Sequence, residues 1–249
     1  MLADTVGQIV WIKPESCKLW CGRDVTEGCW VERSVKLSPY GIGTYAVSNL
    51  EFMYFISKTS YDSTDDVFLD HWKRRRKNAL NITAEMAPHP VVFVSQDDAL
   101  AYCNWAGARL PSFEEWQYAA RGTKGRRFPW GNEFSIERAN TRVARRGGTV
   151  AIDAYSPQGN SVFGVAGLCG NVREWTSTLY EKSGANPDDD LFLACGSAFD
   201  HLSTQQDIPL NWAYKNHATG FRVVYDDSER AEATRLILRD YVSWVEGPP

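Results

Sequence analysis

Two polar segments near the C-terminal end of the chain carry side chains that could bind a ligand or transfer protons. Residues 199–207 and 211–217 are rich in Asp, His, Ser, Thr, Asn and Tyr. Such side chains supply adaptable hydrogen bonds and rigid aromatic contact area. Asp200, His201 and His217 have the side-chain types of acid–base groups, since histidine exchanges a proton near neutral pH. No sequence motif around them indicates a nucleophile or a complete set of metal ligands.

Bulk composition restricts the class of protein that can carry these segments. The chain has 249 residues, of which 43% are hydrophobic and 23% charged, as in an ordinary globular protein. The net charge of −4 gives the whole chain no electrostatic footprint for nucleic acid. We interpret the basic run at residues 73–77 as a solvated face, because it has no flanking aromatics arranged for stacking.

Hydropathy and the N-terminal sequence bear on localisation. No window approaches the run of about 18 apolar residues that a membrane span requires, so we expect no membrane contact. Residues 1–8 have neither a basic n-region nor a long apolar h-region, so we expect no signal peptide and a cytoplasmic protein. In that compartment the six cysteines are expected to be reduced and mostly buried.

The elements that must position the polar segments begin with helices. Ser48 with Glu51, and Ser112 with Glu115, form the S-x-x-E pattern of a capping box and predict two helix starts. Ser95, followed by an aspartate in the first turn, predicts another. Apolar residues recur at helical spacing after each start, which predicts that each helix buries one face.

Strands and loops account for most of the remaining chain. Residues 8–12, 29–37 and 41–47 are predicted as short strands, and the middle one alternates apolar and polar residues. From 121 to 220, Gly, Asn and Pro recur every few residues, which favours a small sheet with long loops pinned by aromatics. A final helix is predicted at about 228–245, either packing back on the domain or serving as an oligomerisation or partner helix.

Short blocks in a fixed order identify the scaffold. They are Arg-Leu-Pro-Ser-Phe-Glu-Glu-Trp at 109–116, Pro-Trp-Gly-Asn at 129–132, Gly-Asn-Val-Arg-Glu-Trp at 170–175 and Gly-Phe-Arg-Val-Val at 220–224. Together they resemble the formylglycine-generating-enzyme (sulfatase-modifying factor) family. The resemblance implies an α+β, C-type-lectin-like fold with little regular secondary structure.

The extent of the resemblance suggests a division of the chain. It spans roughly residues 30 to 225, which is most of the sequence. We therefore predict an N-terminal strand segment at 1–29, a formylglycine-generating-enzyme-like domain at 30–226 and a C-terminal helical extension at 227–249.

The family's copper chemistry requires a cysteine pair that this sequence does not repeat. In the family, two thiolates follow an Arg-Gly-Gly-Ser motif and hold copper(I), a soft ion that soft ligands suit. The matching motif here is Ala-Cys-Gly-Ser at 194–197, and the thiolate positions fall on Asp200 and Gln205. Carboxylate and amide oxygens are hard ligands, so we expect neither copper nor formylglycine generation.

Iron chemistry is not expected either. Iron-dependent sulfoxide synthases with a similar domain take a three-histidine site from a separate helical domain. This chain has four histidines, none of them in an HxxxH or HxH pair. The segment before the family-like domain is also too short to be such a helical domain.

Structural calcium is the cofactor that the resemblance implies. By resemblance, Gly170 and Val172 would offer carbonyl oxygens and Glu174 a carboxylate, a mixture that suits calcium. An upstream position that often supplies a further ligand is Gly167 here. The alternative is that Glu174 and Asn171 hydrogen-bond the backbone of a tight loop. A second calcium loop near residue 140 is shortened and carries three arginines, Arg142, Arg145 and Arg146, which would repel a cation.

Two functions from different classes follow. The first is a non-catalytic module that binds an unknown protein or small molecule, as in the variable proteins of diversity-generating retroelements, which this scaffold resembles. The binding residues predicted by that resemblance are Asp200, His201, Ser203, Thr204, Gln205, Asn211, Trp212, Tyr214, Asn216 and His217. The second is an enzyme with altered oxidative chemistry, in which the acid–base groups named above would act together with Glu174.

Overall fold

The fold is known for most of the chain. The computed structural model describes residues 4–15, 17–23, 30–63, 67–73, 82–181, 190–201, 208–211 and 214–246. Of the predicted binding residues, Ser203, Thr204, Gln205 and Trp212 lie outside these ranges.

Helices and strands alternate irregularly along the chain. The helices are α1 (Asn49–Thr59), α2 (Asp70–Lys73), α3 (Gln96–Trp105), α4 (Phe113–Arg121) and α5 (Ser228–Glu246), with short 3-10 turns η2 (Ile136–Arg138) and η3 (Arg142–Ala144). The strands are β1 (Ile9–Ile12), β2 (Cys17–Arg23), β3 (Trp30–Val35), β4 (Tyr40–Gly43), β5 (Arg173–Glu181), β6 (Leu191–Cys195), β7 (Ile208–Asn211), β8 (Thr219–Gly220) and β9 (Val224–Tyr225).

Three helices begin where the sequence predicts. Ser48, Ser95 and Ser112 are the N-caps of α1, α3 and α4, and each hydroxyl accepts a hydrogen bond from a backbone N–H in the first turn. In each case an acidic side chain three residues later accepts from the N-cap backbone, which completes a capping box. These local interactions depend on neighbouring residues only, so the sequence is sufficient to predict them.

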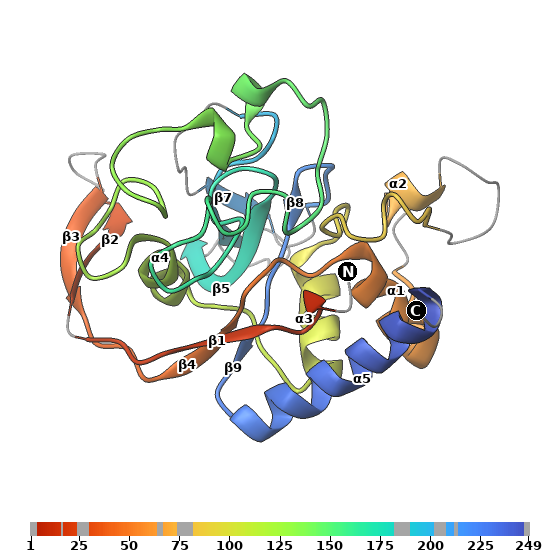
Figure 1. The fold of residues 1–249 in the computed structure, drawn as a ribbon. Coiled ribbons are helices and arrows are strands. Elements are labelled where there is room, and N and C mark those ends of the chain that lie inside the picture. Colours follow the sequence, from red (N-terminus) through yellow and green to blue (C-terminus); the bar gives the residue numbers. More distant parts are fainter. Residues whose placement is uncertain are drawn as a thin grey trace.

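The strands form small sheets rather than one large layer (Figure 1). β1, β4 and β9 form one antiparallel sheet, so the N-terminal strand is part of the same domain as the strand near the C-terminus. β2 pairs with β3. The third sheet has the order β7-β6-β5-β8, in which β5 and β8 are parallel. This arrangement confirms the predicted α+β fold with limited regular structure.

The C-terminal helix packs against the body of the protein. Leu238 and Val242 of α5 are buried together with Val6 and Leu50. In Figure 1, α5 runs along the side of the molecule that carries α1 and α3. Leu236, Ile237 and Val245 of the same helix are exposed. Among the described residues no helix combines the length and apolar character that a membrane crossing needs.

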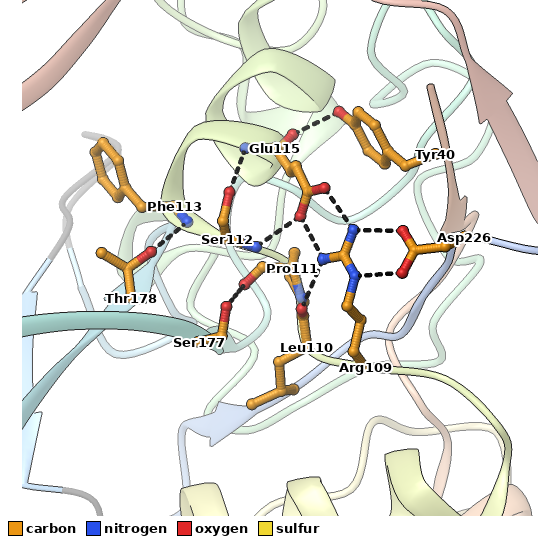
Figure 2. Close-up of polar contacts among 10 residues, drawn as sticks. All are labelled: Tyr40, Arg109, Leu110, Pro111, Ser112, Phe113, Glu115, Ser177, Thr178 and Asp226. Atoms are coloured by element: carbon orange, nitrogen blue, oxygen red, sulfur yellow. Dashed lines mark hydrogen bonds and ion pairs between the residues drawn. The ribbon is translucent and has the colours of Figure 1, made fainter. Parts of the chain in front are cut away.

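The start of α4 is tied to the end of the family-like domain through Arg109 (Figure 2). Its guanidinium lies between the carboxylates of Glu115 and Asp226, with Nη2 2.6 Å from Glu115 Oε1 and 2.8 Å from Asp226 Oδ1. Burial opposes the charged form of Arg109, but hydrogen bonds to Glu115 and Asp226 outweigh it and raise the pKa. Tyr40 donates its hydroxyl to the Glu115 carbonyl at 2.7 Å, which ties β4 to the same helix.

Candidate ligand-binding site

A buried ion pair forms the base of the candidate site. Arg222 and Glu174 are both fully buried, and two hydrogen bonds join them, from Nε to Oε2 at 2.5 Å and from Nη2 to Oε1 at 2.7 Å. The remaining N–H groups of Arg222 donate to the carbonyls of Gly43, Thr44 and Ala166. All five N–H groups of the guanidinium therefore have acceptors, as a buried charge requires.

The same arrangement tests the predicted calcium site. Both carboxylate oxygens of Glu174 accept from Arg222, and Oε2 also accepts from Trp116 Nε1 at 2.7 Å. The carbonyl of Gly170 accepts from the N–H of Val172 at 3.0 Å. A carboxylate paired with a buried guanidinium does not fit a calcium ligand, because the cation would lie beside a positive charge. In this structure Glu174 is therefore an ion-pair partner of Arg222, and the calcium site stays a prediction that these contacts do not favour.

Above this base, a second carboxylate is surrounded by nitrogen groups. Asp200 Oδ2 lies 3.2 Å from Nε2 of His217, and Oδ1 lies 3.3 Å from Nδ1 of His201. Asp200 Oδ1 is also 3.6 Å from Nη2 of Arg173. The structure thus brings together three residues that the sequence marked, and it adds Arg173.

Arg173 is the buried member of this cluster. Its side chain is only 5% exposed, against 38% for His201 and 57% for His217. Burial lowers the pKa of Arg173, and the nearby Asp200 and Tyr214 act in the opposite direction. An arginine keeps its charge even so, because its ordinary pKa is far above neutral. Nη2 of Arg173 is also in close contact with Nε2 of His201.

Two buried polar atoms of the cluster have no hydrogen-bond partner among the described residues. They are Nε of Arg173 and Oδ1 of Asp200, and both are shielded from solvent. Oδ1 lies near two nitrogens without making a hydrogen bond to either, so the contacts there are electrostatic only. Buried polar groups usually have partners, so these two atoms retain hydrogen-bonding capacity that a ligand could use.

The elements below place these side chains together. Arg173 begins β5 and Thr219 begins β8, and the two are register partners in the parallel pair. Along β5, Glu174 points to the core ion pair, so the adjacent Arg173 points to the other face of the sheet. Asp200 follows the end of β6, and His217 precedes β8. The cluster therefore lies where β5 and β8 begin and β6 ends, at one end of these strands of the third sheet.

Other predicted binding residues have mixed roles. Tyr214 is exposed and available for contact. Asn216 has a structural role, since its Oδ1 accepts from the N–H of Ala218 at 2.7 Å and its carbonyl accepts from that of Phe93 at 2.8 Å. Asn211 ends β7, and its side chain is outside the described part of the structure.

Aromatic rings border His217. The ring of Phe199 lies 5.5 Å from that of His217, and the ring of Phe93 lies 6.4 Å from it. Phe93 has a left-handed backbone with φ of 58° and stacks on His71. The sequence pattern around Phe93 gives no indication of this contact, which depends on a loop far from the candidate segments.

Thiols do not contribute to the site in the described residues. Cys103, Cys169 and Cys195 are buried. Burial raises the pKa of Cys103, and it raises that of Cys169 to about 11 although a hydrogen bond with Ser197 acts in the opposite direction. The thiolate is the reactive and metal-binding form, so buried thiols with raised pKa values are poor nucleophiles.

The chain belongs to the family of the sulfatase-modifying factor enzyme 1-like domain. The family model matches residues 4–227, which include the three sheets and the buried ion pair at the base of the site. A mouse relative named inactive C-alpha-formylglycine-generating enzyme 2 is 31% identical over 204 residues, covering 65% of each chain. A Thermomonospora curvata protein named formylglycine-generating enzyme is 35% identical over 188 residues, covering 57% of this chain and 61% of its own. The chain thus spans about 65% of the mouse relative's length.

Solved structures with low identity share the fold. PvdO from Pseudomonas aeruginosa has a TM-score of 0.65 at 20% identity, covering 87% of this chain and 93% of its own. Treponema denticola variable protein 1 has a TM-score of 0.64 at 15% identity, covering 88% of this chain and 95% of its own. These similarities establish the C-type-lectin-like scaffold and nothing finer.

Proposed function

We propose that this chain is a non-catalytic binding module, and that its binding face is formed by Asp200, His201, Tyr214 and His217. One observation carries the proposal. The position that the family resemblance assigns to a reactive thiol holds Asp200, whose carboxylate lies among the nitrogens of Arg173 and two histidines. This group has the chemistry of polar recognition, because charged and aromatic side chains converge on a partly exposed surface.

The scaffold beneath the face supports a binding role. The buried Arg222–Glu174 pair and the strand pairing of β5 with β8 hold the face from below. A rigid frame lowers the entropy that a binding loop loses on contact with its ligand. A mouse relative has the word inactive in its name, which supports the proposal that a member of this family can lack the catalytic activity.

A more specific version of this proposal is that the chain is a variable protein of a diversity-generating retroelement. A Treponema denticola protein named variable protein 1 has this fold, and its likeness supports the scaffold only. A near-repeat of the coding sequence for residues 195–224 beside a reverse-transcriptase gene would identify the segment as diversified. A gene neighbourhood with neither feature would leave a fixed binding face.

Selection of ligands provides the direct test. A random peptide library displayed on phage would be panned against the full chain, and the recovered peptides assayed against variants. We expect binding to fall at least about tenfold with Asp200→Asn and with His217→Ala. Arg239→Ala changes an exposed residue on α5 and is the matched control. Peptides that bind all three variants equally, or a library that yields no binders, would contradict the proposed face.

A further inference from the structure

We propose that this face extends onto the arginine loop, residues 142–146, and that the combined surface binds an acidic peptide segment of a partner protein. The inference rests on the proposed binding function and names the chemistry of the partner. It uses residues outside the segments that the family resemblance marks as variable.

The arginine loop is physically continuous with the face. The backbone N–H of Arg142 donates to the carbonyl of His201 at 2.9 Å. Arg142 begins η3, and the following turn closes through hydrogen bonds from Ala144 to Thr141 and from Arg145 to Arg142. The loop that carries the arginines therefore starts within one hydrogen bond of the Asp200–His201 segment.

The base of the loop is fixed by two asparagines. Nδ2 of Asn140 donates to the carbonyl of Gly148 at 2.9 Å. The side chain of Asn171 bonds both the N–H and the carbonyl of Val150, at 2.9 and 3.0 Å. The N–H of Asn171 donates to the carbonyl of Asn140 at 2.7 Å. Both ends of the loop are thus held before any ligand arrives.

Gly170 makes this close approach sterically possible. Its φ is +82°, and a Cβ at this position would lie 2.5 Å from the carbonyl oxygen of Asn140. Only glycine fits such a contact. The Gly-Asn pair of the 170–175 block therefore holds the arginine loop, while Arg173 of the same block lies under Asp200.

The positive charge of the loop is not paired within the described part of the chain. Arg142, Arg145 and Arg146 are exposed, and no carboxylate among the described residues forms an ion pair with them. Arg173, which lies beside Asp200, adds a fourth guanidinium group to these three. The whole chain has a net charge of −4, so this patch is opposite in sign to the rest of the protein. Such a local reversal favours a partner of negative charge.

The form of the patch favours carboxylates over a phosphate backbone. Guanidinium groups bind carboxylates and phosphates alike with two parallel hydrogen bonds, so the choice between the two depends on the rest of the surface. Val143 lies between the arginines and is 42% exposed, which offers an apolar contact to a peptide side chain. A single-stranded nucleic acid needs a longer positive groove with aromatic rings for stacking.

The test uses a fluorescein-labelled peptide of about twelve residues with alternating Glu and Ser, and a Gln counterpart of the same length. Binding to the full chain would be followed by fluorescence anisotropy. We expect the Glu peptide to bind and the Gln peptide to bind at least about tenfold more weakly. Raising NaCl from about 50 to about 300 mM should weaken the Glu peptide further, because salt screens exposed charges.

The decisive variant is Arg142→Ala/Arg145→Ala/Arg146→Ala. Its matched control, Arg127→Ala/Arg230→Ala/Arg239→Ala, removes the same charge at exposed positions elsewhere. We expect a loss of at least about tenfold in affinity for the first and less than about twofold for the second. If the triple variant does not fold, as judged by circular dichroism, the single Arg146→Ala with about a threefold loss replaces it.

Several results would overturn the inference. They are equal losses in both triple variants, no binding of the Glu peptide, and tighter binding of a thymidine oligonucleotide of equal length. If panned library peptides require Asp200 and His217 but carry no excess of acidic residues, the proposed binding face stands and the acidic partner is wrong. If no library peptide depends on those two residues, the proposed function itself fails.

Discussion

Arg222 and Glu174 form a bidentate ion pair inside the protein, although 48 residues separate them in the chain. Trp116 adds a third hydrogen bond to the carboxylate, and Gly43 accepts one from the guanidinium. The pair thus joins four separate stretches of the sequence at one point. It explains why blocks so far apart occur together in this scaffold.

Removal of one partner should be costly. Glu174→Ala leaves Arg222 buried without a counter-charge, so we expect a loss of about 3–5 kcal/mol in the free energy of unfolding. Glu174→Gln keeps the shape and one acceptor oxygen, so its loss should be smaller. Urea denaturation measures both. A loss below about 1 kcal/mol for Glu174→Ala would show that the pair is not a central contact.

Local patterns explain which parts of this structure the sequence could predict. The starts of α1, α3 and α4 depend on a hydroxyl and a carboxylate three residues apart, so Ser48, Ser95 and Ser112 mark them without tertiary information. The scaffold followed from blocks recognised by resemblance. For residues 121–220 the sequence indicated a small sheet with long loops but not the positions of its strands, and β5 was missed because its nine residues do not alternate strictly.

The site needed long-range information that the sequence alone does not hold. Asp200, His201 and His217 were marked by their side-chain types, and the structure brings them together. Arg173 was missed because its role depends on the parallel pairing of β5 with β8. The family resemblance indicated Glu174 as a possible calcium ligand, and nothing in the sequence indicated its ion pair with Arg222 because that residue lies in a distant block.

Trp175 should behave as a buried anchor. It is fully buried, and its Nε1 donates to the carbonyl of Val94 at 3.1 Å. Trp175→Ala would leave a cavity and an unpaired carbonyl, so we expect a loss of about 3–5 kcal/mol in unfolding free energy. Trp11, which is 44% exposed, provides the control, and Trp11→Ala should lose far less. Equal losses for the two variants would contradict the observed burial.

His71 should make stability depend on pH. Burial lowers its pKa from 6.5 to about 3, while Asp70 opposes the shift and His89 reinforces it. The folded protein therefore holds neutral His71, with Nε2 2.9 Å from Oδ1 of Asn49. Because the folded pKa lies below the unfolded value, this stabilisation is complete above about pH 6.5 and is lost as the pH falls toward 3.

The matching measurement compares wild type with His71→Gln by urea unfolding between pH 7 and pH 4. The difference in their unfolding free energies should shift in favour of the variant by up to about 1.4 kcal/mol per pH unit below pH 6. A difference that stays constant over this range would show that His71 does not resist protonation in the folded state.

The buried cysteines should react only after unfolding. Cys103 and Cys169 have raised pKa values because of burial, and Cys195 is completely shielded from solvent. Native protein treated with iodoacetamide near pH 8 should therefore remain unlabelled at these three positions, as read by peptide mass spectrometry. Protein treated in denaturant is the control and should be labelled at all three. Rapid native labelling of Cys169 or Cys195 would instead indicate an accessible thiol near the site and would weaken the case against thiol chemistry.

Asp200 should affect both stability and recognition. The side chain of Arg173 is 5% exposed, and Asp200 is the carboxylate that the described residues place near it. Asp200→Ala should therefore lower the free energy of unfolding by about 1–3 kcal/mol, because the guanidinium stays buried without its counter-charge. His217→Ala should cost much less, since that side chain is 57% exposed. The double variant Arg173→Met/Asp200→Ala separates the two roles, because it removes the uncompensated charge and should recover stability without recovering binding. If the double variant does not recover stability, Arg173 supports the start of β5 through packing rather than through its charge.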